Sequence, residues 1–491
     1  MGQPAFAPPR AGLPPRILAA APWALVGVAL SVGTGVLLGA HPLIPLDLGL
    51  VVAAAVLIAI RPYPALLAVV TVNVISPWHL FWTSLTAAGV GLAVLVRVPA
   101  GIPRRVMLPL LALLVLTLPG VPVHPSPDEG NVPPVVTLPA LHIRYSDAVS
   151  TELSAWIGVA SVLATFCLAA WAVTTRRRLS WFVGALLVGS LYPIAYAFKQ
   201  YAAGDLTVRT NQSSSFAAVR GPFHHPNFLA FYLLVVIGIT LAAFIEARRL
   251  AVRLALLGLL AAASVCLFLT YTRSAWIGAA IVVLVLGLLR YRILLVGGAI
   301  ALALAAFAFP AAARKVQDRF GDLSTSSESH ASNSWKWRTG QWSRMEHWGW
   351  ERPFLGQGFG SYQRLSIKEF GYFDRHYQVA DPGHPFAPRG IAPHNDYVKM
   401  FVETGIIGLS LWVLTLGGLI SAAWRARRAP PLRAYARAMV AVMIALAMVS
   451  YADNVQGYTT VLLVTSAMIG GLAGLQRASR SRPATPTAGP T

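Results

Sequence analysis

The chain has 491 residues, of which 56% are hydrophobic and only 12% are charged, and its formal net charge is +21. Soluble proteins carry about 25% charged residues, so this composition excludes an ordinary water-soluble enzyme and indicates that lipid is the main solvent. The positive charge does not indicate nucleic-acid binding, because the basic residues stand in short clusters between apolar runs, as topology signals do. Cys167 and Cys266 lie inside apolar runs and predict neither a disulfide framework nor a metal site.

Many apolar segments approach the ~20 residues that a helix needs to cross the hydrocarbon layer. The candidate spans are 17–40, 44–60, 64–78, 79–97, 106–122, 151–175, 180–202, 225–246, 250–270, 274–289, 293–310, 394–422, 438–453 and 458–475. The third and fourth are short enough to be re-entrant, so we expect 12–14 transmembrane helices. The start of the chain lacks a small-residue cleavage site, so we expect the first span to be retained. Backbone polar groups in lipid must be bonded within the protein, which predicts an all-α polytopic membrane protein.

The distribution of arginine predicts the orientation of the spans. More than half of the basic residues fall in alternate short connections, such as 176–178, 248–253 and 425–437. Cytoplasmic loops carry an excess of Lys and Arg. We therefore expect both termini on the cytoplasmic side and the connections 123–150, 203–224 and 311–393 on the outer side.

This topology divides the chain into five parts. They are an N-terminal transmembrane bundle (1–204), transmembrane helices with two arginine motifs (205–310), one large extracytoplasmic loop domain (311–393), C-terminal transmembrane helices (394–475) and a disordered cytoplasmic tail (476–491). Within the large loop, we expect the Trp-rich stretch from Ser334 to Trp350 to form an amphipathic helix at the membrane interface.

Two arginines are not explained by the topology rule. Arg220 lies at the end of an outer loop, in the sequence Arg-Gly-Pro-Phe-His-His-Pro-Asn (220–227), and Arg273 lies between two spans that are joined by almost no loop. Cations at membrane depth are expensive and usually have a partner or a function. A third polar motif, Pro-His-Asn-Asp (393–396), begins a later span. The predicted topology places all three motifs at the outer boundary of the membrane.

This combination favours a phosphate site beside a general base. Two guanidinium groups bind phosphate oxygens in a bidentate way. The helix starts at His225-Pro226-Asn227 and His394-Asn395 add further donors. A neutral histidine such as His394 is a candidate general base. Transfer of a group from a lipid diphosphate requires such a set, since the arginines offset charge on the leaving diphosphate and the base takes a proton from the attacking hydroxyl.

Each residue also has a structural interpretation. Asn227 and His394 are consistent with helix caps, Arg273 with a snorkelling anchor of a span end, and Arg220 with binding of lipid headgroups. Their joint placement on one side of the membrane favours the functional interpretation.

Two further alternatives concern the acidic residues. Glu403 is placed to pair with Lys399, one helical turn away. A metal site would need the neighbouring histidine and acidic side chains, and no ligand spacing supports it: His224, His225, His394 and Asp396.

The ordered motifs resemble those of the O-antigen ligase superfamily, which includes lipopolysaccharide O-antigen ligases, polysaccharide polymerases and protein O-oligosaccharyltransferases. Arg-Gly-x-x-x-His-Pro-Asn-x-x-Ala (220–230) is followed by Thr-Arg-Ser-Ala-Trp (272–276) and, after the large loop, by a motif that begins His394-Asn395 and ends Glu-x-Gly-x-x-Gly (403–408). The segment Pro-Phe-Leu-Gly-Gln-Gly-Phe-Gly (353–360) also fits. The resemblance covers residues 205–410, and the earlier spans match only in hydropathy.

The resemblance implies a GT-C-like glycosyltransferase in the bacterial inner (cytoplasmic) membrane, with its active site facing the periplasm. It implies an undecaprenyl-diphosphate-linked glycan as donor, inversion at the anomeric centre, and no metal or other cofactor. Arg220 and Arg273 would bind the donor diphosphate, and His394 would act on the acceptor hydroxyl. The residues of the large loop that would shape the donor cleft are Arg338, Trp342 and Tyr362.

The resemblance leaves the acceptor open. A ligase transfers the glycan to lipid A-core, a polymerase to another lipid-linked glycan, and an oligosaccharyltransferase to a protein. We favour a ligase, because the outer loops before residue 205 are short and the one large loop comes late. A polysaccharide transporter or flippase is the alternative from another class, but the sequence has no paired halves with matching interrupted helices. A structural protein of the envelope would predict that Arg220, Arg273 and His394 do not converge.

Overall fold

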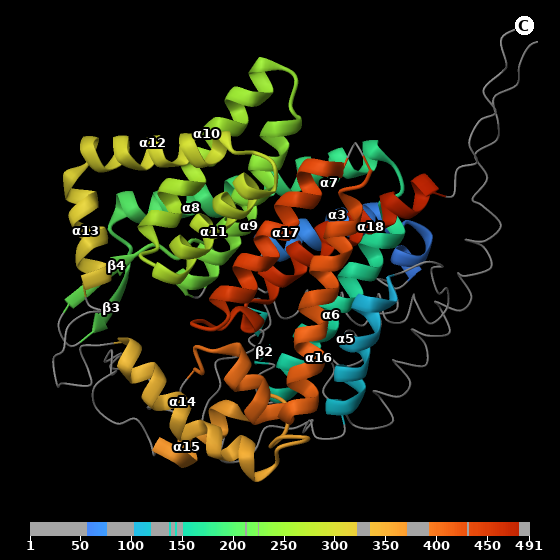
Figure 1. Cartoon of the computed structure of the whole chain (residues 1–491), viewed down its shortest axis with the longest axis vertical. Helices are drawn as coiled ribbons and strands as arrows, with labels where there is room; N and C mark the ends of the chain where they lie inside the picture. Colours follow the sequence, from blue (N-terminus) through green and yellow to red (C-terminus); the bar gives the residue numbers. More distant parts are fainter. Residues whose placement is uncertain are drawn as a thin grey trace, which may run out of the picture.

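A computed structural model describes residues 56–75, 103–118, 137–138, 143–144, 151–211, 214–223, 225–321, 334–370, 392–429 and 432–480 of the chain. In these ranges the protein is a bundle of α-helices with two small β-hairpins (Figure 1). The predicted spans 17–40 and 79–97, and most of 44–60, lie outside the described residues.

Six helical runs in the described ranges are long and apolar enough to cross a membrane, which confirms the predicted all-α polytopic architecture. They are α6 (Thr151–Ala172), α7 (Arg176–Gly189) continued by α8 (Leu191–Ala203), α9 (Pro226–Glu246), α10 (Leu250–Leu269), α16 (Asp396–Ala426) and α18 (Thr459–Arg480). Shorter helices are α3 (Pro62–Ile75), α5 (Arg104–Thr117), α11 (Arg273–Leu289), α12 (Ile293–Ala308) and α17 (Arg433–Val449). Helix α18 reaches into the predicted tail, whose remainder from 481 lies outside the described residues.

Two predicted elements differ in detail from the structure. The span expected over 180–202 is interrupted at Ser190, between α7 and α8. The interruption lies just before Pro193, which lacks the N–H that would bond to the carbonyl of Gly189. The outer connection 203–224 contains an antiparallel hairpin of β3 (Thr207–Asn211) and β4 (Ser214–Ala218), which the hydropathy pattern did not predict. A second hairpin joins β1 (Thr137–Leu138) and β2 (Ile143–Arg144).

Helix α9 forms the centre of the described bundle. It is apolar on every face, and nearly every side chain from Pro226 to Ala243 is buried. A helix that is apolar all round must be covered by protein or lipid on all sides, and α9 contacts α7, α10, α11, α17 and α18 (Figure 1). This packing fixes the position of the polar residues at its N-terminus.

Helices α6 and α18 approach each other through small residues. Gly470 and Gly474 of α18 lie four residues apart and face the carbonyl oxygens of Phe166 and Ala170, so closely that an added Cβ would overlap them. Such small-xxx-small spacing allows helix backbones in a membrane to come into direct contact. The sequence of α18 thus fixes its place beside α6.

The described part of the large loop is mostly helical. It contains α13 (Pro310–Gly321), α14 (Ser334–Glu351) and α15 (Tyr362–Phe370), and α14 and α15 lie together at the bottom of Figure 1. The predicted helix from Ser334 to Trp350 is therefore confirmed as a helix.

A kink in α16 fits the glycine-rich segment 353–360 of the large loop. Gly405 has φ 63° and ψ −167°, a conformation that only glycine adopts readily. The N–H groups of Gln357 and Gly358 donate to the carbonyls of Val402 and Glu403, each at 2.9 Å. A Cβ at Gly356 or Gly405 would overlap the facing backbone. The glycines at these positions thus permit the loop backbone to pack directly on the kink.

Glu403 ties this kink to α15. One carboxylate oxygen accepts from the N–H of Tyr362 at 3.1 Å, and the other lies 3.4 Å from Lys399 Nζ. The predicted Glu403–Lys399 pair is confirmed, and because Glu403 is fully buried, the pair compensates a charge that burial alone would penalise.

Two adjacent glycines in α16 give a matched test of the contact between α5 and α16. A Cβ at Gly418 would overlap the Arg105 carbonyl of α5, whereas a Cβ at Gly417 would meet no atom within 4 Å. We expect Gly418→Ala to lower the free energy of unfolding by about 1–3 kcal/mol and Gly417→Ala to leave it unchanged or slightly raised. Thermal unfolding of the purified proteins in detergent measures both, and equal stability of the two variants would contradict the contact between α5 and α16.

Candidate functional site

The carboxylate of Asp453 is the centre of a buried polar network. Asp453 lies in the connection between α17 and α18 and is 1% exposed. Its Oδ2 accepts from Asn227 Nδ2 at 3.0 Å and from Ser274 Oγ at 2.8 Å. Its Oδ1 accepts from the Tyr458 hydroxyl at 2.7 Å. A buried carboxylate needs such partners, because an unpaired one would cost several kcal/mol.

Two of the predicted motifs meet at this carboxylate. Asn227 belongs to the motif 220–230, and Ser274 follows Arg273 in the motif 272–276. The two motifs are also bonded directly, since Thr272 Oγ1 donates to Asn227 Oδ1 at 3.1 Å. Asp453 therefore joins segments that are some fifty residues apart in sequence and places Arg273 beside the network.

Arg220 is held near the same place by its backbone. The N–H groups of Arg220 and Gly221 donate to the buried Gln200 Oε1, at 3.3 and 2.8 Å. The N–H of Val219 donates to the carbonyl of Leu269, at the end of α10. The chain continues from Leu269 directly into the motif with Arg273, so both arginines lie on segments anchored around the end of α10. The Arg220 side chain is exposed, and no side chain or carbonyl in the described ranges accepts from its guanidinium.

His394 joins the network through the residue after Asp453. The backbone N–H of His394 donates to Asn454 Oδ1 at 2.6 Å, and Asn454 Nδ2 lies 3.5 Å from His394 Nδ1. The Trp337 ring meets the imidazole edge-on, at 6.2 Å between centroids. The third predicted motif is therefore adjacent to the first two, through Asp453 and Asn454.

Two of these segments contain a residue in the left-handed backbone conformation. Among the described residues, Tyr271 (φ 50°) and His394 (φ 49°) are the non-glycine residues with positive φ. This conformation is strained for residues with a Cβ and persists only where the surroundings enforce it. It changes the chain direction just before Arg273 and at His394 itself.

Helix α14 attaches the large loop to the His394 segment. Trp342 Nε1 donates to the carbonyl of Pro393 at 2.8 Å, and Gln341 Nε2 to that of Ala392 at 3.1 Å. Arg338 Nη1 donates to the carbonyl of Ala452, next to Asp453. Arg338 is thus beside the network, and Trp342 contacts the segment before His394.

Two of the predicted substrate-binding residues, His225 and Asn395, cap helices. His225 is the N-cap of α9, since its Nδ1 accepts from the Asn227 N–H at 3.2 Å; the cap is therefore not Asn227, which bridges Thr272 and Asp453 instead. Asn395 is buried and caps α16 through the N–H groups of Tyr397 and Val398.

Tyr362 lies apart from the network. It is 1% exposed and packs with Met345, Leu365 and Val402 in a small core of the large loop. Its hydroxyl lies 3.5 Å from Gln341 Nε2, so its connection to the His394 segment runs through α14.

The charges around Asp453 keep it ionised. Burial raises the pKa of Asp453, but the electrostatic influence of the neighbouring His394 and Arg338 and the hydrogen bonds from Tyr458 and the Asn454 N–H outweigh it and lower the pKa below the ordinary value of 3.8. A negative charge therefore lies between the segments that carry the arginines and the histidine at neutral pH.

Asp453 and Asn454 were not among the residues predicted from the sequence. The sequence did contain a signal for Asp453, because an acidic residue between two apolar spans is as exceptional as the arginines on which the prediction rested. In the described part of the chain, no three His, Cys, Asp or Glu side chains are grouped to hold a metal ion; His224 lies outside it.

The depressed pKa predicts a specific pH dependence of stability. The Asp453 carboxylate stabilises the folded state above its ordinary pKa of 3.8, and this contribution is lost as the pH falls toward the lower folded-state pKa. We expect Asp453→Asn to be less stable than the unmodified protein by about 1.5–3 kcal/mol at neutral pH, with the difference shrinking below about pH 4. Thermal unfolding across this pH range measures it. A difference that stays constant down to pH 3 would show that the charge of Asp453 is not the stabilising feature.

Residues 257–413 match a family model described as O-antigen ligase. The matched segment contains Arg273, Arg338 and His394, whereas Arg220 and Asp453 lie outside it. No curated protein matches the chain.

Proposed function

We propose, from the O-antigen ligase domain that the chain carries over residues 257–413, that this membrane protein transfers a glycan from an undecaprenyl-diphosphate donor to an acceptor hydroxyl on the periplasmic face of the inner membrane. The domain confirms the resemblance to the O-antigen ligase superfamily and a membrane enzyme of the ligase or polymerase type. The observation that carries the finer proposal is the convergence on Asp453 and Asn454. The segments of Arg220 and Arg273 bond to Asp453 through Asn227 and Ser274, and His394 bonds to Asn454.

The two arginines are proposed to hold the donor diphosphate. Guanidinium groups match phosphate oxygens in geometry and remain charged at any working pH. As the bond between the sugar and the diphosphate breaks, negative charge grows on the leaving oxygen, and fixed cations stabilise that charge without reorganisation. Arg338, beside Asp453, extends this positive surface toward the large loop.

His394 is proposed to act on the acceptor hydroxyl. Its backbone is fixed by Asn454 and its ring is bordered by Trp337. The imidazole takes the proton of the hydroxyl as its oxygen attacks the anomeric carbon, on the face opposite the leaving diphosphate, so that the configuration inverts. Trp342 and Tyr362 are proposed to support the donor cleft through α14 rather than from the surface, since both are buried.

We favour lipid A-core as the acceptor, and hence an O-antigen ligase that uses no metal. The purified protein should join an undecaprenyl-diphosphate-linked glycan to lipid A-core in the presence of a chelator and without an ion gradient. Transfer only to a second lipid-linked glycan would identify a polymerase, and transfer only to a protein an oligosaccharyltransferase. Movement of the glycan across the membrane without transfer would identify a flippase.

The role of the predicted residues is tested by substitution. We expect Arg220→Ala, Arg273→Ala and His394→Ala each to lower glycan transfer in membranes by about 10²–10³-fold. Arg290→Ala is a matched control, because Arg290 lies at the opposite end of α11 from Arg273, and it should retain full transfer. Normal transfer by all three variants would falsify the proposal.

Asn454 is predicted to be a positioning residue for His394. Asn454→Ala removes the acceptor of the His394 N–H, which lets the strained backbone relax and displaces the imidazole. We expect kcat to fall by about 10- to 100-fold, while the KM for the donor changes little, since Asn454 holds His394 and not the arginines. Steady-state kinetics separates the two constants, and a rise in donor KM with unchanged kcat would assign Asn454 to the donor site instead.

A further inference from the structure

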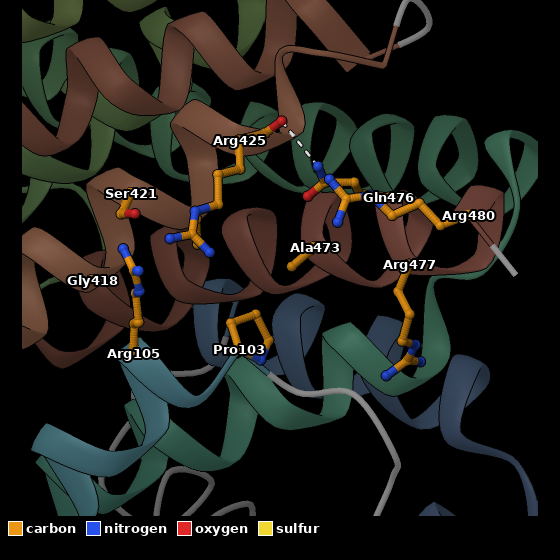
Figure 2. A pocket seen from close by; sticks show the side chains of 10 residues that line it. Pro103, Arg105, Gly418, Ser421, Arg425, Ala473, Gln476, Arg477 and Arg480 are labelled. Carbon is orange, nitrogen blue, oxygen red and sulfur yellow. Dashed lines mark hydrogen bonds between the residues drawn. The ribbon is translucent and has the colours of Figure 1, made fainter.

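A cavity lined by polar side chains lies at the end of the bundle opposite the Asp453 network. It has a volume of about 290 Å³ and lies between the start of α5 and the C-terminal parts of α16 and α18 (Figure 2). The residues that define its ends are Pro103 and Arg105 of α5, Gly418 to Arg425 of α16 and Ala473 to Arg480 of α18. Helices α16 and α18 both begin near the Asp453 network, and at about 1.5 Å per residue the cavity lies more than about 20 Å from it.

The cavity is lined by arginine. Arg105, Arg425, Arg477 and Arg480 contribute to it, and the lining within the described residues includes no acidic side chain. Such a concentration of like charge is unfavourable unless an anion or solvent compensates it. Guanidinium groups in particular favour phosphate, which they bind in a bidentate way.

Arg105 and Arg425 are available to a ligand, whereas Arg477 is already bonded. Arg477 Nη2 donates to the carbonyl of Ala170 at 3.1 Å. In contrast, no group in the described ranges accepts from the guanidinium of Arg105 or Arg425, and both side chains are exposed. Figure 2 shows these two guanidinium groups on the same side of the cavity, next to Ser421.

The start of α5 adds backbone donors. Pro103 is the N-cap of α5 and makes no side-chain cap. Its carbonyl accepts from the N–H groups of Val106 and Met107, which leaves the N–H groups of Arg104 and Arg105 without a hydrogen bond inside the helix. Free N–H groups at a helix start attract anions, and here they lie beside Arg105. Pro103 and Arg105 both line the cavity, so the start of α5 lies at its edge.

The surroundings of the cavity favour a lipid over a soluble anion. The cavity lies at the ends of apolar helices, on the side that the arginine distribution predicts to be cytoplasmic, where lipid headgroups would be expected. Beyond Arg105, α5 exposes Leu108, Leu111 and Val115, which are spaced along one face of the helix. Acyl chains of a lipid held by its phosphate would run along this face.

We propose that the cavity between α5, α16 and α18 binds the phosphate group of an anionic phospholipid of the cytoplasmic leaflet, through Arg105 and Arg425. Basic cavities between transmembrane helices on this side of a membrane are suited to anionic headgroups. The bound lipid would bridge α5 to the C-terminal helices, whose other ends carry the Asp453 network.

The experiment measures lipid retention by native mass spectrometry on the full-length protein, purified with phosphatidylglycerol, cardiolipin or phosphatidylcholine. We expect retention of the anionic lipids but not of phosphatidylcholine. We expect the double variant Arg105→Gln/Arg425→Gln to lower retention of the anionic lipids by about 10- to 30-fold. The control double variant Arg248→Gln/Arg249→Gln removes two exposed arginines outside the cavity and should retain the lipid within about twofold of the unmodified protein.

A parallel arm adds millimolar inorganic phosphate, which should neither displace the lipid nor raise the unfolding temperature of delipidated protein. If phosphate does both, the cavity is a site for a soluble anion and the lipid proposal is overturned. Equal retention by the cavity variant and the unmodified protein, or equal loss in both double variants, also overturns it. If the glutamine variant does not fold, Arg425→Gln alone should lower retention and Arg425→Lys should restore most of it, and equal retention by these two single variants overturns the proposal.

Discussion

The buried carboxylate of Asp453 is the interaction on which the arrangement of the outer end of this protein depends. It binds Asn227 at the start of α9, Ser274 at the start of α11 and Tyr458 before α18, so the starts of three helices are joined by one negative charge. The neighbouring side chains of His394 and Arg338 favour the charged form of Asp453. If that charge were lost, three segments that are distant in sequence would lose their common partner.

The large loop depends on the same end of the bundle through backbone packing. The segment 353–358 packs against the kink at Gly405 through backbone hydrogen bonds. Side chains of α14 donate hydrogen bonds to the two carbonyls that precede His394. The loop is therefore attached on both sides of the histidine, once through α14 and once through α16. Such attachment gives a rigid setting for a residue with a strained backbone, as pre-organised sites require.

Hydropathy predicted most of the described helices to within a few residues, because helix formation in lipid depends mainly on segment length and apolar content. The same reasoning selected Arg220 and Arg273, since a cation that topology does not explain is visible in one sequence. It did not find Asp453, although the same logic applies to acids, nor the role of Asn227, whose side chain acts on residues more than forty positions away. Hairpin β3–β4 was also missed, because it depends on local backbone bonding that hydropathy does not report.

A double-mutant cycle between Asn227 and Asp453 tests most directly whether this network supports activity. Asn227→Ala, Asp453→Asn and the double variant are compared for glycan transfer in membranes, with protein amounts equalised. If the two residues act through their shared hydrogen bonds, each single variant loses transfer and the double variant loses little more than the more affected single variant. Full transfer by Asp453→Asn, or losses that multiply in the double variant, would contradict the account.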